Sequence, residues 1–90
     1  MNTEPQVTLA IEAAIAGGSL EKSRVHFARA LELAPDYLEN HLSRGMYYAR
    51  RAGDAALYAQ CLRRVLDAPP DGIPEQEIAK KKARLQPATL

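Results

Sequence analysis

The side chains that most often perform chemistry are few in this 90-residue chain, which has two histidines and one cysteine. His26 and His41 fall in different predicted helices, and neither has a Cys, Asp or His three or four residues further on to complete a metal site. A reactive thiolate needs a neighbouring base, and only Arg63 and Arg64 carry charge near Cys61. The sequence therefore predicts no metal, no cofactor and no enzymatic activity.

Two other patterns have structural explanations. Gly17-Gly18 lacks the Lys and Ser/Thr that follow the glycines of a phosphate-binding loop, and the end of a helix explains it. The basic run 80–84 suits the negative C-terminal end of a helix, although an acidic partner or an anionic lipid surface is the functional alternative. We interpret this run as a solvated helix end.

Composition narrows the class of protein. Hydrophobic residues make up 47% of the chain, which is too many for a disordered protein. A net charge of +1 gives no excess of positive charge for binding a polyanion, so we expect no nucleic-acid partner. No apolar run approaches the roughly 20 residues of a membrane span, and the polar start is not a signal peptide. We expect no membrane span and a cytoplasmic location, with a periplasmic location as the alternative if the sequence is trimmed.

The chain repeats itself with a shift of 35 residues, which places Gly18 on Gly53 and Pro35 on Pro70. Apolar residues at helical spacing predict two helices in each unit. The prediction is a single all-α domain, residues 1–90, with five helices. Repeat one covers about 4–37, repeat two about 38–72 and a capping helix about 73–86, and we expect the tail from residue 86 to be loose.

Helix boundaries follow from capping residues and helix breakers. Pro35 should end the second helix, Gly53 the third and Pro69-Pro70 the fourth, while Pro74 suits the first turn of the last helix. The N-caps that we predict for the first four helices are Thr3, Ser19, Asp36 and Asp54.

The first unit resembles the second half of a tetratricopeptide repeat. That motif has a glycine at the turn, a small residue and an aromatic residue in the second helix, and a closing proline. Gly18, Ser23, Phe27 and Pro35 match these positions. In the second unit Tyr58 takes the small position, so this unit is degenerate. The resemblance implies a stack of helix-turn-helix repeats that binds protein partners.

Residues 22–85 also resemble the C-terminal part of the T-component proteins of TRAP-type transporters. The resemblance is carried by the segment from His26 to Leu33, by Gly53-Asp54 and by the basic helix that follows Pro74. It implies an exported lipoprotein that assembles and meets a substrate-binding protein. This chain is shorter and has no visible leader or lipid-bearing cysteine.

Stacked helical pairs curve, and the first helix of each pair lines the concave side. We predict a non-catalytic module that binds a protein or an acidic peptide on that side, because Tyr and Arg are frequent binding anchors. The alternatives are an accessory subunit of a TRAP-type or envelope assembly, and a homo-oligomer with a small-ligand pocket between protomers. The candidate partner-binding residues are Asn40, Ser43, Arg44, Tyr47, Arg50 and Arg51.

Overall fold

The computed structural model describes residues 4–15, 19–70 and 72–90, and within them the regular structure is all helical. Three helices are α1 (Glu4–Ile15), α2 (Leu20–Leu33) and α5 (Ala55–Leu66). Between α2 and α5 lies one continuous helix in three parts: α3 (Leu38–Ser43), the π-helical η1 (Arg44–Ala49) and α4 (Arg50–Ala52). The last helix is α6 (Pro74–Arg84). Taking the three-part helix as one, these are the five predicted helices.

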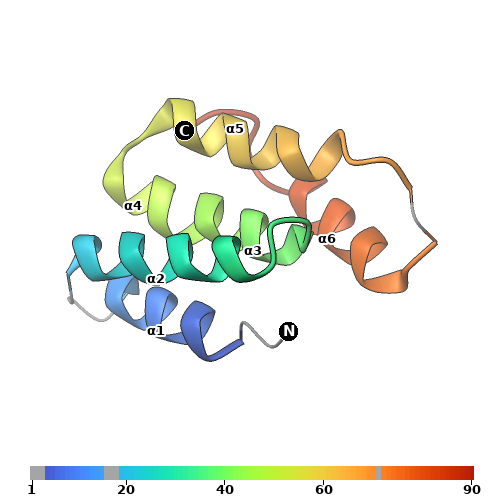
Figure 1. Cartoon of the computed structure of the whole chain (residues 1–90). Coiled ribbons are helices and arrows are strands. Elements are labelled where there is room, and N and C mark those ends of the chain that lie inside the picture. Colours follow the sequence, from blue (N-terminus) through green and yellow to red (C-terminus); the bar gives the residue numbers. More distant parts are fainter. Residues whose placement is uncertain (1–3, 16–18, 71) are drawn as a thin grey trace.

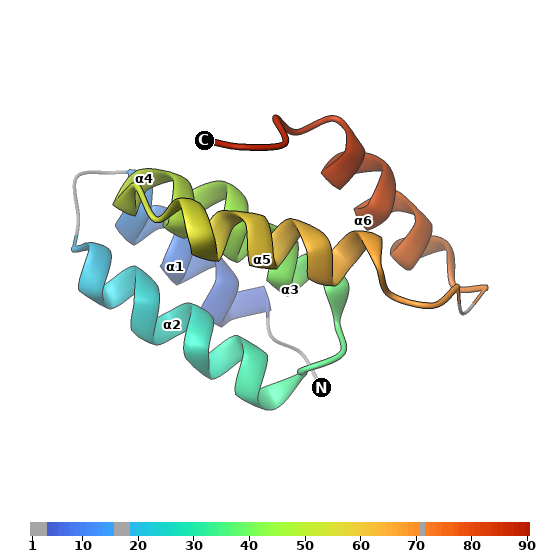
Figure 2. The same ribbon diagram turned by 90° about the horizontal axis from the view of Figure 1, so that it is seen from above.

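The helices pack in the order of the chain. α1 lies against α2, and the α3–η1–α4 helix lies against α5, so that the described part contains two helical pairs (Figure 1). α1 and α2 also contact η1, which joins the pairs. α6 packs against both α3 and α5 at the far end of the stack, as a capping helix does (Figure 2).

Most of the predicted helix boundaries that lie in the described residues are confirmed. The Ser19 hydroxyl accepts from the Lys22 amide at 3.3 Å, and the Asp54 carboxylate accepts from the Leu57 amide at 3.0 Å. Gly53 ends α4 with a φ of 69°, a left-handed conformation that suits glycine. α6 begins with Pro74, as predicted.

One predicted cap is wrong. α3 begins after Tyr37, which offers no side-chain bond to the helix, and not after Asp36. The Asp36 carboxylate instead accepts from Arg64 of α5 at 3.2 Å, so it ties the two helical pairs together. The expected cap at Thr3 and the expected helix end at Gly17-Gly18 lie outside the described residues.

The core lies where the second helical pair meets α6. Leu38 and Leu42 of α3 pack with Tyr58, Leu62 and Val65 of α5, and Ala79 and Ala83 of α6 complete the same cluster. Tyr58, which takes the small position of the repeat, has no exposed surface. A large ring is therefore buried at a position for which the resemblance implied a small residue, and its hydroxyl reaches the backbone carbonyl of Pro87.

The π-helical turn sits where the three-part helix approaches α5 most closely. A Cβ added to Gly45 would lie 2.9 Å from the Cβ of Cys61, closer than real Cβ atoms come. Cys61 is itself buried. A π turn takes one residue more than an α turn, so the side chains that follow it point in directions that a regular α-helix would not give them.

Candidate protein-interaction surface

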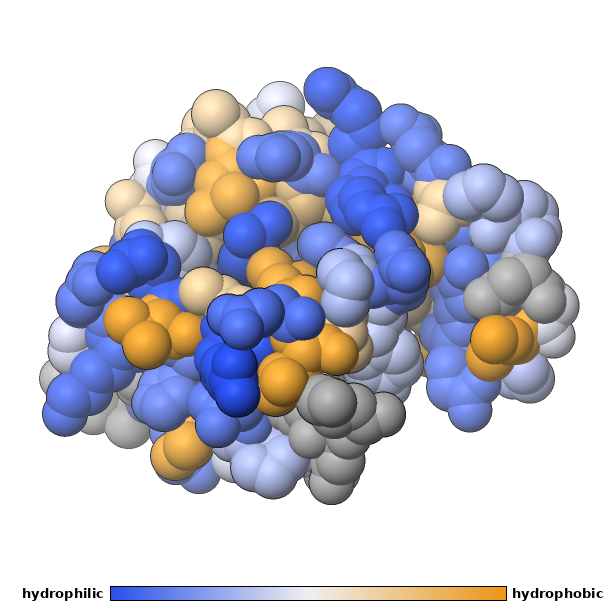
Figure 3. Space-filling view, viewed as in Figure 1, coloured by the Kyte–Doolittle hydropathy of each residue, from blue (hydrophilic) through white to orange (hydrophobic). Residues whose placement is uncertain are grey.

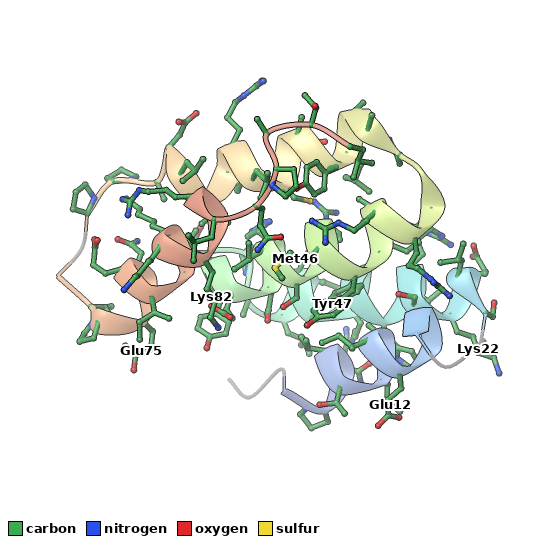
Figure 4. The ribbon with its side chains drawn as sticks, turned by 180° about the vertical axis from the view of Figure 1, so that it is seen from behind. Glu12, Lys22, Met46, Tyr47, Glu75 and Lys82 are labelled. Carbon is green, nitrogen blue, oxygen red and sulfur yellow. The ribbon has the colours of Figure 1, made fainter. Side chains whose placement is uncertain are left out.

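Three helices line one side of the molecule: α1, the α3–η1–α4 helix and α6. We call this side the first-helix face, because it contains the first helix of each pair. Figure 4 shows Met46 and Tyr47 in the middle of this face, between α1 and α6, with Lys82 reaching toward them from α6. Tyr47 is half-buried, which leaves part of its ring open to a partner.

The six predicted partner-binding residues separate into two groups. Tyr47, Arg50 and Arg51 keep exposed surface on the middle and last parts of the three-part helix. Asn40 is only 2% exposed and Ser43 only 9%, so these side chains belong to the packing and not to an open surface. α6 packs against α3 and covers surface that an uncapped first helix would leave open.

Arg44 is directed away from the first-helix face. Its guanidinium lies beside the thiol of Cys61 on α5, and its charge and its hydrogen bonding both act to lower the pKa of that thiol. Burial is the larger effect and raises the pKa of Cys61. The thiol is therefore protonated at neutral pH and behaves as a small buried hydrophobe.

A charged pair spans the first-helix face beside Tyr47. The Lys82 ammonium of α6 donates to the Glu39 carboxylate of α3 at 2.8 Å. This hydrogen bond raises the pKa of Lys82, and the charge of Glu39 and the nearby hydroxyls of Tyr47 and Tyr37 act in the same direction. Two tyrosines, an ammonium and a carboxylate thus lie together where α6 crosses α3.

Arg50 is the anchor at the other end of the face. Its guanidinium lies over the ring of Tyr58 at 5.6 Å from the centroid and donates to the Tyr58 hydroxyl at 3.3 Å. The same nitrogen donates to the side-chain oxygen of Gln86 at 3.0 Å. The Tyr58 hydroxyl donates in turn to the backbone carbonyl of Pro87 at 2.7 Å. Residues 86 and 87 are therefore held in place, contrary to the expected loose tail.

The basic run on α6 is less solvated than its composition indicates. Lys80 is only 6% exposed, and its ammonium donates to the backbone carbonyl of Ala68, just after α5. Lys82 is paired with Glu39. The interpretation of the whole run as a solvated helix end is therefore wrong for Lys80, whereas Lys81, Lys82 and Arg84 are exposed.

Apolar side chains are also exposed away from this face. Leu9 is 45% exposed and Val25 49%, while Leu57 is half-buried against the core. On the side of the molecule drawn in Figure 3, apolar residues form separate spots between hydrophilic ones. A homo-oligomer built on such residues stays a prediction.

A metal site and a membrane span each set requirements for the described segments. Within residues 4–15, 19–70 and 72–90, no group of three or more His, Cys, Asp or Glu side chains is placed to hold a metal ion. Among the helices in the same ranges, none is long and apolar enough to cross a membrane.

Sequence reasoning missed Tyr37, Glu39 and Lys82, and it missed the contacts of Arg50 with Tyr58 and Gln86. Lys82 stood out in the sequence only as part of the basic run. No local pattern indicates its bond with Glu39, which lies 43 positions earlier. Tyr58 was noticed as an oversized residue at a small position. The hydroxyl of this oversized side chain bonds to Arg50 and to the backbone carbonyl of Pro87.

Comparison with known proteins gives one match. The family model described as TRAP transporter T-component matches residues 6–90. No curated protein and no solved structure matches. The matched range includes α6 and residues 86–90 as well as both helical pairs.

Proposed function

This chain belongs to the TRAP transporter T-component family, and from that membership we propose that it is a non-catalytic accessory subunit of a TRAP-type solute transport system. The family match over residues 6–90 is the observation that carries the proposal. It favours an accessory subunit of a TRAP-type assembly over a general protein-binding module. It also makes the other components of the transporter the expected protein partners.

We propose the first-helix face as the surface that meets the partner. Tyr47 offers rigid aromatic area, and the Glu39–Lys82 pair beside it offers both signs of charge. Such a mixed surface gives orientation and specificity more than raw affinity. The sequence predicted an acidic ligand for this face, but Lys82 already has a carboxylate partner. We therefore place the preference for acidic groups at Arg50, which donates to two uncharged oxygens.

The chain offers matched controls for a capture experiment. Tyr48 is also half-buried, but it lies near Arg24 of α2 and so on another side of the helix. Lys81 is exposed next to Lys82 and makes no ion pair with the residues that the structure describes. Tyr47→Ala and Lys82→Ala test the proposed surface, whereas Tyr48→Ala and Lys81→Ala change the same residue types elsewhere.

The full chain should be used to capture partners from the cells that encode it, with the bound proteins identified by mass spectrometry. We expect the wild type, Tyr48→Ala and Lys81→Ala to retain a transporter component that Tyr47→Ala and Lys82→Ala lose. Capture of no transporter component by the wild type would refute the accessory role. Equal capture by all variants would refute the surface. Fractionation of the same cells decides between the cytoplasmic and periplasmic locations.

A further inference from the structure

Residues 86–90 lie on the protein as a bound peptide would. They follow α6 and run back along α5 toward α4, as the two ribbon views agree (Figures 1 and 2). Two bonds tie them to the second helical pair: Arg50 donates to the side-chain oxygen of Gln86, and Tyr58 donates to the backbone carbonyl of Pro87. Gln86 also donates back to α6, from its backbone amide to the carbonyl of Ala83 and from its side-chain amide to the carbonyl of Lys82. No regular secondary structure joins this segment to its neighbours.

The donors that hold this segment are themselves fixed. The Tyr58 ring is fully buried in the core, so its hydroxyl has a defined position. The Arg50 guanidinium lies over that ring, which orients its donors. A rigid tyrosine and an oriented guanidinium form a built site for a chain segment that presents two successive acceptors.

The present occupant satisfies this site incompletely. Arg50 is a cation, yet the group that it binds in residue 86 is an uncharged amide. A carboxylate at the same place would form a charge-assisted, two-pronged bond, which is stronger than a bond to an amide.

A hollow beside the segment is also partly empty. It has a volume of about 310 Å³, and its apolar lining comes from Ala59, Leu62, Leu66, Ala83 and Ala88. Gln86 and Ala88 line it from residues 86–90, and Arg63, Asp67 and Arg84 add charged groups to its lining. A larger apolar side chain in place of Ala88 would bury more apolar surface there.

We propose that Arg50 and Tyr58 form a binding subsite for an extended acidic peptide segment, which residues 86–90 occupy as an internal, weaker ligand. The favoured segment carries a carboxylate where Gln86 lies and a larger apolar side chain two residues later. Its assignment to a transporter partner rests on the proposed function, whereas the chemistry of the subsite does not. A partner segment that binds here displaces residues 86–90.

The chemistry is tested first within the full chain. The ratio of docked to undocked segment is read from the amide chemical shifts of Ala88 and Thr89 over a temperature series. We expect Gln86→Glu to raise this ratio about two- to fivefold, as exposed ion pairs do. Combined with Arg50→Gln, the same change should have no effect. An equal effect in both backgrounds would overturn the assignment of Arg50.

The apolar hollow is tested by a matched pair of variants. Ala88→Leu should raise the docked ratio about fivefold or more, because the added carbons leave water. Thr89→Leu adds the same kind of side chain at a residue that does not line the hollow, and it should leave the ratio unchanged. A similar gain from both variants would show that any added apolar side chain favours the docked state, and it would refute the hollow as a specific pocket.

Displacement is tested with an acetylated and amidated peptide of residues 84–90 that carries Glu in place of Gln86 and Leu in place of Ala88. Added to the full Gln86→Ala chain, it should shift the signals of Ala88 and Thr89 to their undocked positions. It should do so at about tenfold lower concentration than the unmodified peptide, as the ion pair and the added apolar contact together predict. Equal potency of the two peptides would refute the proposal. If the preference holds but no transporter component is captured, the proposed function fails and the subsite stands.

Discussion

The close approach of Gly45 in η1 to Cys61 of α5 requires glycine at this position, and Gly45→Ala tests that requirement directly. The added methyl would lie 2.9 Å from the Cβ of Cys61, an atom that cannot move without the backbone of α5. Overpacking of this kind costs about 1–3 kcal/mol, and the gain in helix propensity over glycine offsets about 1 kcal/mol. Because the neighbour is rigid, we expect a net loss of about 1–2 kcal/mol and a fall in Tm of about 5–15 °C.

The assay is urea and thermal unfolding of the full chain followed by circular dichroism. A thermodynamic cycle with Cys61→Gly removes the facing Cβ and separates the clash from other effects. In that background Gly45→Ala should become neutral or stabilise by up to about 1 kcal/mol, since only its helix propensity remains. If Gly45→Ala costs the same free energy in both backgrounds, or stabilises the wild type, the close approach of η1 to α5 is not what requires glycine.

Two other perturbations test the packing around the interaction surface. Burial lowers the pKa of His41, so below about pH 6.5 the unfolded chain binds a proton that the folded chain does not. The free energy of unfolding should therefore fall as the pH is lowered from 6.5 toward the depressed pKa, and His41→Gln should flatten that dependence in urea titrations from pH 5 to 8. Lys80→Met leaves the carbonyl of Ala68 without its charged donor and should cost about 1.5–3 kcal/mol, whereas Lys81→Met at an exposed site should change stability by less than about 0.5 kcal/mol.

The elements of the fold could be predicted because their signals are local. A serine or aspartate before an apolar stripe, a glycine after it and a proline at a first turn each act within a few residues. Ser19, Asp54, Gly53 and Pro74 behave accordingly in the structure. Asp36 did not, because Arg64 competes for its carboxylate from 28 residues away. A local rule gives no account of such a competitor.

The candidate surface could be predicted only in part, for a related reason. Helical spacing placed Asn40, Ser43 and Tyr47 on one face, but the spacing could not say which of them α6 and its neighbours would cover. The π-helical turn also escaped prediction, and so did the close approach of Gly45 in this turn to Cys61. Tyr47 kept its exposure, and the residues that accompany it there come from α6 and from the turn before α3.

The distribution of basic side chains shows why composition alone misleads about this surface. The run 80–84 reads as a single cationic patch, yet one ammonium binds a buried carbonyl and another binds Glu39. Arg50, which lies outside that run, instead contacts two uncharged oxygens and so keeps its charge available for a carboxylate. Affinity for an acidic segment therefore depends less on how many cations the chain carries than on which cation lacks an anion. Arg50 meets that criterion at the end of the first-helix face where Gln86 and Pro87 already lie.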